Sequence, residues 1–179
     1  MRAEVTLRPA RAGEAEAICA IYNQGIEDRV ATLETELRTP GERREWLAAR
    51  GPRHPVITAE SGGTPGAAGA VIGWGSLNVF NARPAYRHVA DFSVYVDRTW
   101  RGKGVGHRLL ERLIEVARAI GYHKMALSTF PTNTGGVRLY ERLGFSRVGV
   151  YREQGLLDGL WVDTLIMEKL LSPRDRAGP

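Results

Sequence analysis

The alternation of apolar and polar positions along the chain predicts a mixed α/β protein. Strands are predicted where β-branched and aromatic residues recur at every second position, as at Phe92, Val94 and Val96. Helices are predicted where apolar residues recur about once per turn, as in the run 105–120. The predicted strands are 5–8, 55–60, 71–79, 91–96, 125–129, 145–151 and 162–170, and the predicted helices are 13–26, a helix opened by Pro40, and 105–120.

Three segments interrupt this pattern. Residues 28–39 have no clear period, and an irregular connector of that length is long for a compact domain. Residues 61–69 are rich in Gly, Pro and Ala and are predicted to form a hairpin loop, not an interdomain linker. Residues 172–179 are predicted to be a flexible C-terminal tail, so we expect one domain over residues 1–171.

Composition narrows the function classes. The 179 residues include 25 Lys and Arg against 20 Asp and Glu, which gives a formal net charge of +5. There is no long block of like charges and no nucleic-acid motif, so we expect a polyanionic small ligand and no nucleic acid. Cys19 is the only cysteine and is predicted to be a buried structural thiol. No apolar stretch reaches the length of a membrane span and no signal peptide is evident, so no membrane contact and a cytoplasmic location are expected.

A glycine-spaced turn between a predicted strand and a predicted helix carries the most specific chemistry. It reads Arg101-Gly-Lys103-Gly104-Val-Gly106. Glycines let the backbone approach a ligand closely, and the free N–H groups at a helix start attract an anion. The Walker and dinucleotide glycine spacings are both absent. The turn is predicted to bind a pyrophosphate, and a helix-capping turn without a ligand is the alternative.

This turn, preceded by a Val-Tyr-Val strand, resembles the coenzyme A loop of the GCN5-related N-acetyltransferases (GNAT family). A second segment, running from Asn133 through Tyr140 to Phe145, is similar to the family's other signature, in which an Asn opens a short helix and Tyr-Glu-x-Leu-Gly-Phe closes it. With that helix, the order β-α-α-β-β-β-α-β-α-β-β matches the family's fold. The resemblance therefore implies the GNAT acyl-CoA N-acyltransferase fold, a mixed twisted sheet flanked by helices.

The resemblance implies acetyl-CoA as the cofactor. In the family, the strand before the pyrophosphate loop separates from its neighbour, and the gap admits the thioester arm, which pairs with the backbone as an added strand would. The amide of Asn133 would contact the cofactor arm, and helix capping is a compatible alternative. The residues so implied to bind acetyl-CoA are Val94, Tyr95, Val96, Arg101, Gly102, Lys103, Gly104, Val105, Gly106, Asn133 and Tyr140.

Within the family, residues 4–171 resemble the phosphinothricin acetyltransferase branch, which also contains methionine sulfoximine acetyltransferases. The matching segments include 21–23, 81–88 and 159–163. The resemblance implies N-acetylation of the α-amino group of a small amino acid or analogue, by direct transfer in a ternary complex, with a role in antibiotic or herbicide resistance. It also implies a homodimer. Acetylation of a protein N-terminus or a polyamine, or a non-catalytic acyl-CoA sensor, remain alternatives.

The same resemblance suggests two catalytic residues. The branch usually has a Glu just before its Ser-Val-Tyr-Val strand, and here Asp91 takes that position. Asp91 is the predicted base, directly or through an ordered water; alternatively it orients Arg87 or His88, and His88 is a rival base. Tyr140 is the predicted general acid for the departing thiolate, with a packed core tyrosine as the alternative.

Acceptor binding is predicted from side-chain chemistry. The Arg83 guanidinium suits a carboxylate or phosphinate, and Tyr86 would form an aromatic wall. Arg87 is a second candidate for holding the anion, and a solvent-facing arginine is the usual alternative. The predicted substrate-binding residues are Thr32, Glu34, Arg83, Tyr86, Arg87 and Trp161, of which Trp161 could equally belong to the core or a dimer interface. No metal site is predicted.

Overall fold

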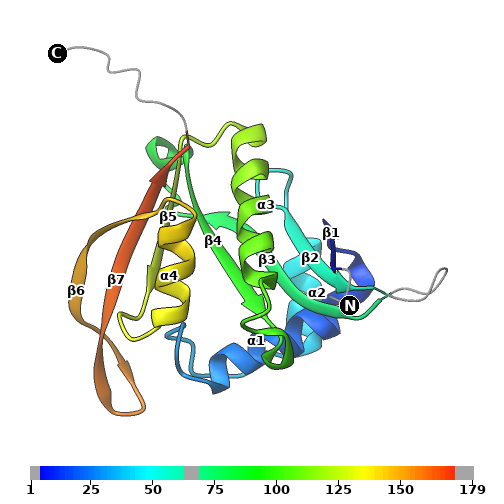
Figure 1. Cartoon of the computed structure of the whole chain (residues 1–179), viewed down its shortest axis with the longest axis horizontal. Helices are drawn as coiled ribbons and strands as arrows, with labels where there is room; N and C mark the ends of the chain where they lie inside the picture. Colours follow the sequence, from blue (N-terminus) through cyan, green and yellow to red (C-terminus); the bar gives the residue numbers. More distant parts are fainter. Residues whose placement is uncertain (1–4, 63–68, 172–179) are drawn as a thin grey trace.

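A mixed seven-stranded sheet forms the centre of the computed structural model, which describes residues 5–62 and 69–171 (Figure 1). Neighbouring strands are antiparallel except for the parallel pair β4–β5, and the order across the sheet is β1-β2-β3-β4-β5-β7-β6. This confirms the predicted mixed α/β class. The strands are β1 (Val5–Pro9), β2 (Val56–Ser61), β3 (Val71–Val79), β4 (Val89–Val96), β5 (Lys124–Thr129), β6 (Ser146–Leu157) and β7 (Leu160–Leu170).

Helices cover both faces of the sheet (Figure 1). One face packs against α1 (Ala15–Glu27) and α2 (Pro40–Ala48), and the other packs against α3 (Val105–Ile120) and α4 (Thr134–Arg142). Three short 3-10 helices connect these elements: η1 (Ala12–Glu14), η2 (Pro84–Tyr86) and η3 (Arg98–Trp100). The order of strands and α-helices is the predicted one.

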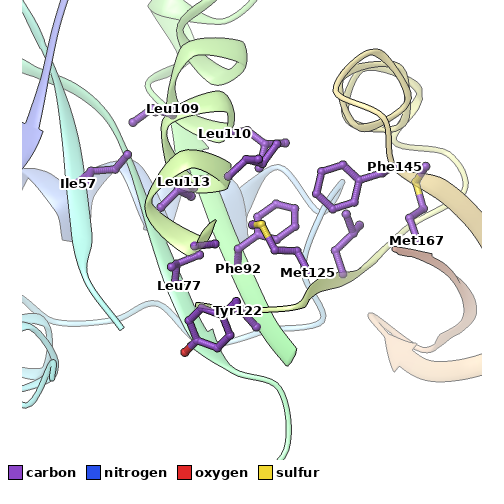
Figure 2. Packing of buried hydrophobic residues seen from close by; sticks show 14 of the residues in the cluster. Ile57, Leu77, Phe92, Leu109, Leu110, Leu113, Tyr122, Met125, Phe145 and Met167 are labelled. Carbon is purple, nitrogen blue, oxygen red and sulfur yellow. The ribbon is translucent and has the colours of Figure 1, made fainter. Parts of the chain in front are cut away.

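The larger core lies between the sheet and α3, and Figure 2 shows its packing. Leu109, Leu110 and Leu113 are fully buried, because their spacing places them on the side of α3 that faces the sheet. Each such leucine stabilises the fold by about 2 kcal/mol through the apolar surface it removes from water. Met125 on β5 and Phe145 after α4 extend the same core toward β7.

Two glycines in β3 allow α3 to lie close to the sheet. A β-carbon at Gly75 would lie 2.9 Å from Cδ1 of Leu113, and one at Gly73 would lie 3.1 Å from Cδ1 of Leu109. The β2–β3 register also shifts beside Gly73, which leaves Ile72 as an extra residue on β3. The strand therefore combines a close approach to α3 with a bulge.

The boundaries differ from the prediction at a few places. The first helix begins with the 3-10 turn η1 before α1 starts at Ala15, and β6 continues six residues beyond Tyr151 to Leu157. Thr39 caps α2 in a capping box with Glu42, a Thr-x-x-Glu signal that the prediction based on Pro40 did not use. The predicted hairpin loop falls mostly on residues 63–68 and the predicted tail on 172–179, outside the described residues.

Candidate active site

β4 and β5 are paired only at their first residues. Their parallel pairing ends at Ala90 and Met125, whereas β4 remains paired with β3 as far as Val96. Across the described ranges 5–62 and 69–171, the side of β4 that faces β5 therefore has no strand neighbour from Asp91 onward. Main-chain groups along that edge are available to an extended ligand. The strand separation implied by the resemblance is thus confirmed.

A cavity of about 310 Å³ opens at this separation. Its walls come from α1, the segment 28–39, β4, β5, α4 and β7, and it contains both predicted catalytic residues, Asp91 and Tyr140. Glu34 is the other carboxylate in the lining, and no Lys or Arg lines the cavity among the residues that the structure describes. A volume of this size can hold a small acceptor.

Asp91 and Tyr140 reach the cavity from opposite faces of the sheet. Residues alternate between the two faces along β4, so Asp91 shares a face with Tyr95, and Phe92 lies on the other. The Tyr95 ring packs against Tyr22 of α1 with ring centroids 4.9 Å apart, whereas Tyr140 of α4 packs against Phe92 with centroids 5.9 Å apart. The gap between β4 and β5 joins the two sides.

The Asp91 carboxyl has the properties of a base. Burial raises its pKa to about 6, and the backbone N–H of Phe92, which donates to Oδ1 at 2.7 Å, only partly offsets that rise. The group is mostly ionised at neutral pH, yet its pKa is close enough to neutrality to accept a proton. His88 is exposed, accepts a hydrogen bond from Arg87 and does not line the cavity. The geometry therefore favours Asp91 over His88.

The Tyr140 hydroxyl is held in its protonated form. Burial, assisted by the negative charge of Asp91, raises the pKa of Tyr140 to about 12. Its ring packs against Phe92 and Phe145, so Tyr140 is also a packed tyrosine, as the alternative proposed. The same side chain also lines the cavity and can serve there as a proton donor.

The glycine turn before α3 adopts the conformation that its sequence predicts. Gly102 and Gly104 have φ values of 73° and 85°, in the left-handed region that favours glycine, and Gly104 is the N-cap of α3. A β-carbon at either position would meet no protein atom within 4 Å, which leaves space for a ligand beside the turn. The side chain of Val105 is buried in the core, so only its backbone can face a phosphate.

Two basic side chains flank this turn, and both have contacts within the chain. The Arg101 guanidinium donates to the Val96 carbonyl at 3.0 Å and to the Asp28 carboxylate, and the Lys103 ammonium lies 5.0 Å from the centre of the Trp100 ring. Positive charge, left-handed glycines and the N-terminus of a 16-residue helix meet here. These residues, with the free edge of β4, fit acetyl-CoA.

Asn133 acts as the N-cap of α4. Its Oδ1 accepts the Gly136 N–H at 3.1 Å, and its Nδ2 donates to the Thr129 hydroxyl at 3.1 Å. The capping role is confirmed. Both ends of the Asn133 amide have partners within the chain. Contact between Asn133 and the cofactor arm therefore stays a prediction.

The structure divides the predicted acceptor residues into two groups. Thr32 and Glu34 line the cavity beside Asp91. The other four do not line the cavity of this chain: Arg83, Tyr86 and Arg87 lie in the exposed loop around η2, and Trp161 is 64% exposed near the start of β7.

The segment 28–39 is a wall of the cavity and not a simple connector. At its start, Arg29 donates to Asp158 in the β6–β7 turn at 3.0 Å and to the Glu34 carbonyl at 3.1 Å. At its end, the Arg38 backbone exchanges two 2.9 Å hydrogen bonds with the Asn23 side chain. The thiol of Cys19, buried as predicted, also donates to the Arg38 carbonyl, at 3.1 Å. These contacts hold the segment against α1 and the β6–β7 hairpin.

Sequence reasoning missed five polar residues of the cavity: Tyr22, Ser93, Ser128, Thr129 and Thr164. Tyr22 lies in a segment that supports the family resemblance, but nothing in its helical spacing separates it from a core residue. In the structure it packs between Tyr95 and the guanidinium of Arg43, whose Cζ lies 3.9 Å from the ring centre. Ser128 and Thr164 occupy ordinary strand positions, and the sequence contains no signal for their role.

Comparison with known proteins gives consistent matches. The model of the acetyltransferase (GNAT) family matches residues 18–145. The YwnH protein of Bacillus subtilis is 35% identical over 168 residues, which cover 94% of this chain and 100% of that protein. The L-methionine sulfoximine/L-methionine sulfone acetyltransferase of Pseudomonas aeruginosa is 32% identical over 169 residues, 94% of this chain and 95% of that protein. A phosphinothricin acetyltransferase from Sinorhizobium meliloti, solved in complex with acetyl-CoA, has a TM-score of 0.87 at 30% identity and covers 100% of this chain and 94% of its own.

Proposed function

Because the chain belongs to the acetyltransferase (GNAT) family, we propose that it transfers an acetyl group from acetyl-CoA to the α-amino group of a small amino acid or analogue of the phosphinothricin or methionine sulfoximine type. The observation that carries the proposal is the cavity at the β4–β5 separation, where Asp91 and Tyr140 meet from opposite faces of the sheet. The substrates named for similar proteins support the acceptor class.

Acetyl-CoA, when bound, supplies the acetyl thioester. The backbone of residues 94–96 and the turn 101–106 would hold it. An amine attacks only without its extra proton, so the Asp91 carboxylate accepts a proton from the acceptor ammonium, directly or through water. Binding both reactants in one cavity supplies orientation, and a positioned base adds about 10²–10⁴-fold.

The Tyr140 hydroxyl provides the matching proton donor. Its pKa of about 12 keeps it protonated at neutral pH, so its O–H donates a hydrogen bond to the sulfur as negative charge develops on the departing thiolate. Transfer is direct in this proposal, because Cys19 is buried and does not line the cavity.

Recognition of the acceptor's acid group is assigned to the η2 loop. Among the described residues, the cavity lining has two carboxylates and no cation, so positive charge for a carboxylate or phosphinate would come from outside the lining. Arg83, with Tyr86 and Arg87, is the proposed holder. Replacing Arg83 with Ala is expected to raise KM for the acceptor about ten-fold or more and to leave KM for acetyl-CoA unchanged.

A homodimer is also part of the proposal. Strand β6 lies at the edge of the sheet and is exposed along most of its length. An edge strand and apolar side chains that remain exposed are typical of a surface covered by another chain. Light scattering on the purified protein gives the oligomeric state. The exposed apolar residues on this part of the molecule are Val148, Val150, Tyr151, Leu156, Leu160 and Trp161.

The proposed location is the cytoplasm, where acetyl-CoA is available. No helix in residues 5–62 and 69–171 is long and apolar enough to cross a membrane. A resistance role follows if the acceptor is a toxic analogue, since acetylation removes its amino charge. Expression in a sensitive host would then raise the tolerated concentration of phosphinothricin or methionine sulfoximine.

A polyamine is the second candidate acceptor, because Glu34 and Asp91 make the cavity lining acidic. The test is free-thiol release from acetyl-CoA with phosphinothricin, methionine sulfoximine, ordinary amino acids, spermidine and an amine-free blank. Turnover of the amino-acid analogues supports the proposed function, and preference for spermidine supports the second candidate. Acetyl-CoA binding without thiol release for any amine contradicts both and supports the sensor alternative.

A further inference from the structure

Thr164 on β7 has a buried hydroxyl without a partner. The residue is 3% exposed, and its Oγ1 has no hydrogen-bond partner within the described part of the chain. Burying a hydroxyl without a partner destabilises a protein, and nearly all such groups in folded proteins are paired. A position that keeps an unpaired hydroxyl is therefore a candidate for contact with a ligand.

Thr164 is also one of the residues around the cavity that contains Asp91. Its neighbour Leu165 points into the core on the α3 side, so the alternation of β7 directs Thr164 to the opposite face, which is the face of Asp91 and Tyr95. The pairing of β5 with β7 ends at Leu165, so Thr164 lies just beyond the last paired residue, where the sheet opens.

The backbone around Thr164 is held in place by a bulge in the neighbouring strand. Thr164 pairs with Tyr151, and the β6–β7 register shifts directly after that pair. Asp163 closes the bulge, because its carboxylate accepts the backbone N–H of Glu153 at 2.8 Å. The position of the Thr164 backbone is thus set before any acceptor arrives.

Other hydroxyls of the cavity already accept hydrogen bonds within the chain. Thr129 accepts from Asn133 at 3.1 Å, Ser93 accepts from Asn78 at 3.0 Å, and Thr32 accepts from the Glu34 backbone at 3.1 Å. Ser128 also lines the cavity, but it is exposed to solvent. Among the serine and threonine hydroxyls of this lining, that of Thr164 is thus the buried one that has no partner in the described part of the chain.

We propose that the Thr164 hydroxyl oxygen accepts an N–H hydrogen bond from the amino group of the acceptor and so orients that amine in the cavity beside Asp91. The inference rests on the proposed function, because it presupposes an amine acceptor. An ammonium has three N–H groups; one gives its proton to the base, and the others need acceptors. Thr164 supplies one of these and acts as a binding residue.

The test compares Thr164→Val, which keeps the shape and removes the hydroxyl, with Thr164→Ser, which keeps the hydroxyl. With methionine sulfoximine as acceptor, kcat/KM is expected to fall about ten-fold or more in Thr164→Val and to stay within about three-fold of wild type in Thr164→Ser. KM for acetyl-CoA should not change. The Tm of Thr164→Val should be no lower than that of wild type, because no internal hydrogen bond is lost.

Thr58→Val is the matched control for a buried hydroxyl that does have partners. Thr58 is fully buried, its hydroxyl accepts from Arg8 at 3.2 Å, and it is not one of the residues that line the cavity. This variant should lower Tm without changing kcat/KM.

Three results would overturn the inference: kcat/KM within two-fold of wild type in Thr164→Val, an equal loss in Thr164→Ser, or a Tm lowered by several degrees in Thr164→Val. A wild-type enzyme that acetylates no amine overturns the proposed function itself. An active wild-type enzyme with an equally active Thr164→Val overturns only the role of Thr164.

Discussion

The carboxylate of Asp28, at the C-terminal end of α1, accepts hydrogen bonds from Arg101 of the cofactor turn and from Arg98 in η3. Burial raises the pKa of Asp28, but the hydrogen bonds from the two arginines outweigh it and leave that pKa below its usual value. Asp28 also begins the segment 28–39 that lines the cavity. One side chain therefore joins the glycine turn 101–106 to the segment that forms a wall of the cavity.

Removal of this carboxylate should destabilise the protein. In Asp28→Ala, two charge-assisted contacts are lost and Arg98 and Arg101 repel each other, so the free energy of unfolding should fall by about 1–2 kcal/mol. Glu27→Ala is the control, because Glu27 is half exposed and pairs with Arg98 alone. Urea denaturation measures both variants. Equal small losses would show that the Asp28 contacts contribute no more than a surface ion pair.

Comparing substitutions at Gly104 and Gly121 should separate the effect of backbone strain from the effect of lost contact with acetyl-CoA. Gly104 and Gly121 cap the two ends of α3 with φ values of 85° and 90°. An alanine at either position costs about 1–2 kcal/mol of stability, because both require the left-handed region. Gly104→Ala alone should raise the Kd for acetyl-CoA, by ten-fold or more, and Gly104→Val and Gly106→Val should abolish binding. Calorimetry that finds normal affinity in Gly104→Val would refute the pyrophosphate site.

The pKa of Asp91 sets the expected pH dependence of the reaction. A base with a pKa of about 6 is ionised only above that value, so kcat/KM should rise as pH rises through about 6. Asp91→Asn should lower kcat by about 10²-fold or more and remove this rise. Steady-state rates between pH 5 and about 8 provide the measurement, and a rise that persists in Asp91→Asn would exclude Asp91 as the titrating group.

Asp91→Asn should raise the stability of the fold at neutral pH, although it lowers kcat. The folded-state pKa of about 6 lies above the unfolded value of about 3.9, so Asp91 stabilises the fold when protonated, and this stability is lost as pH rises through about 6. At pH about 7.5, Asp91→Asn should therefore be more stable than wild type by up to about 3 kcal/mol. The difference should vanish near pH 4, which denaturation at the two pH values can check.

Tyr140→Phe isolates the proton donor. The substitution keeps the ring contacts with Phe92 and Phe145 and removes only the hydroxyl. Turnover should fall about ten-fold or more, while the Kd for acetyl-CoA should change little. Single-turnover rates and calorimetry measure the two quantities, and an unchanged turnover would remove Tyr140 from the mechanism.

Local patterns were sufficient for the elements that neighbouring residues specify. The apolar spacing of 105–120 predicts α3, and the glycines before it predict the left-handed turn, because both depend on contacts within a few residues. The candidate base Asp91 is different, because the resemblance to the phosphinothricin acetyltransferase branch suggests it and the local pattern does not.

Tertiary structure decided what surrounds those elements. Asp91, Tyr140 and Thr164 are far apart in sequence, and only the separation of β4 from β5 brings them to one cavity. The raised pKa of Asp91 comes from burial, and Arg101 is held by an Asp28 carboxylate 73 residues away. The sequence determined the elements and their reactive groups, because these follow from local propensity and side-chain chemistry. Desolvation and long-range contacts, which give these groups their working state, depend on how the whole sheet and its helices pack.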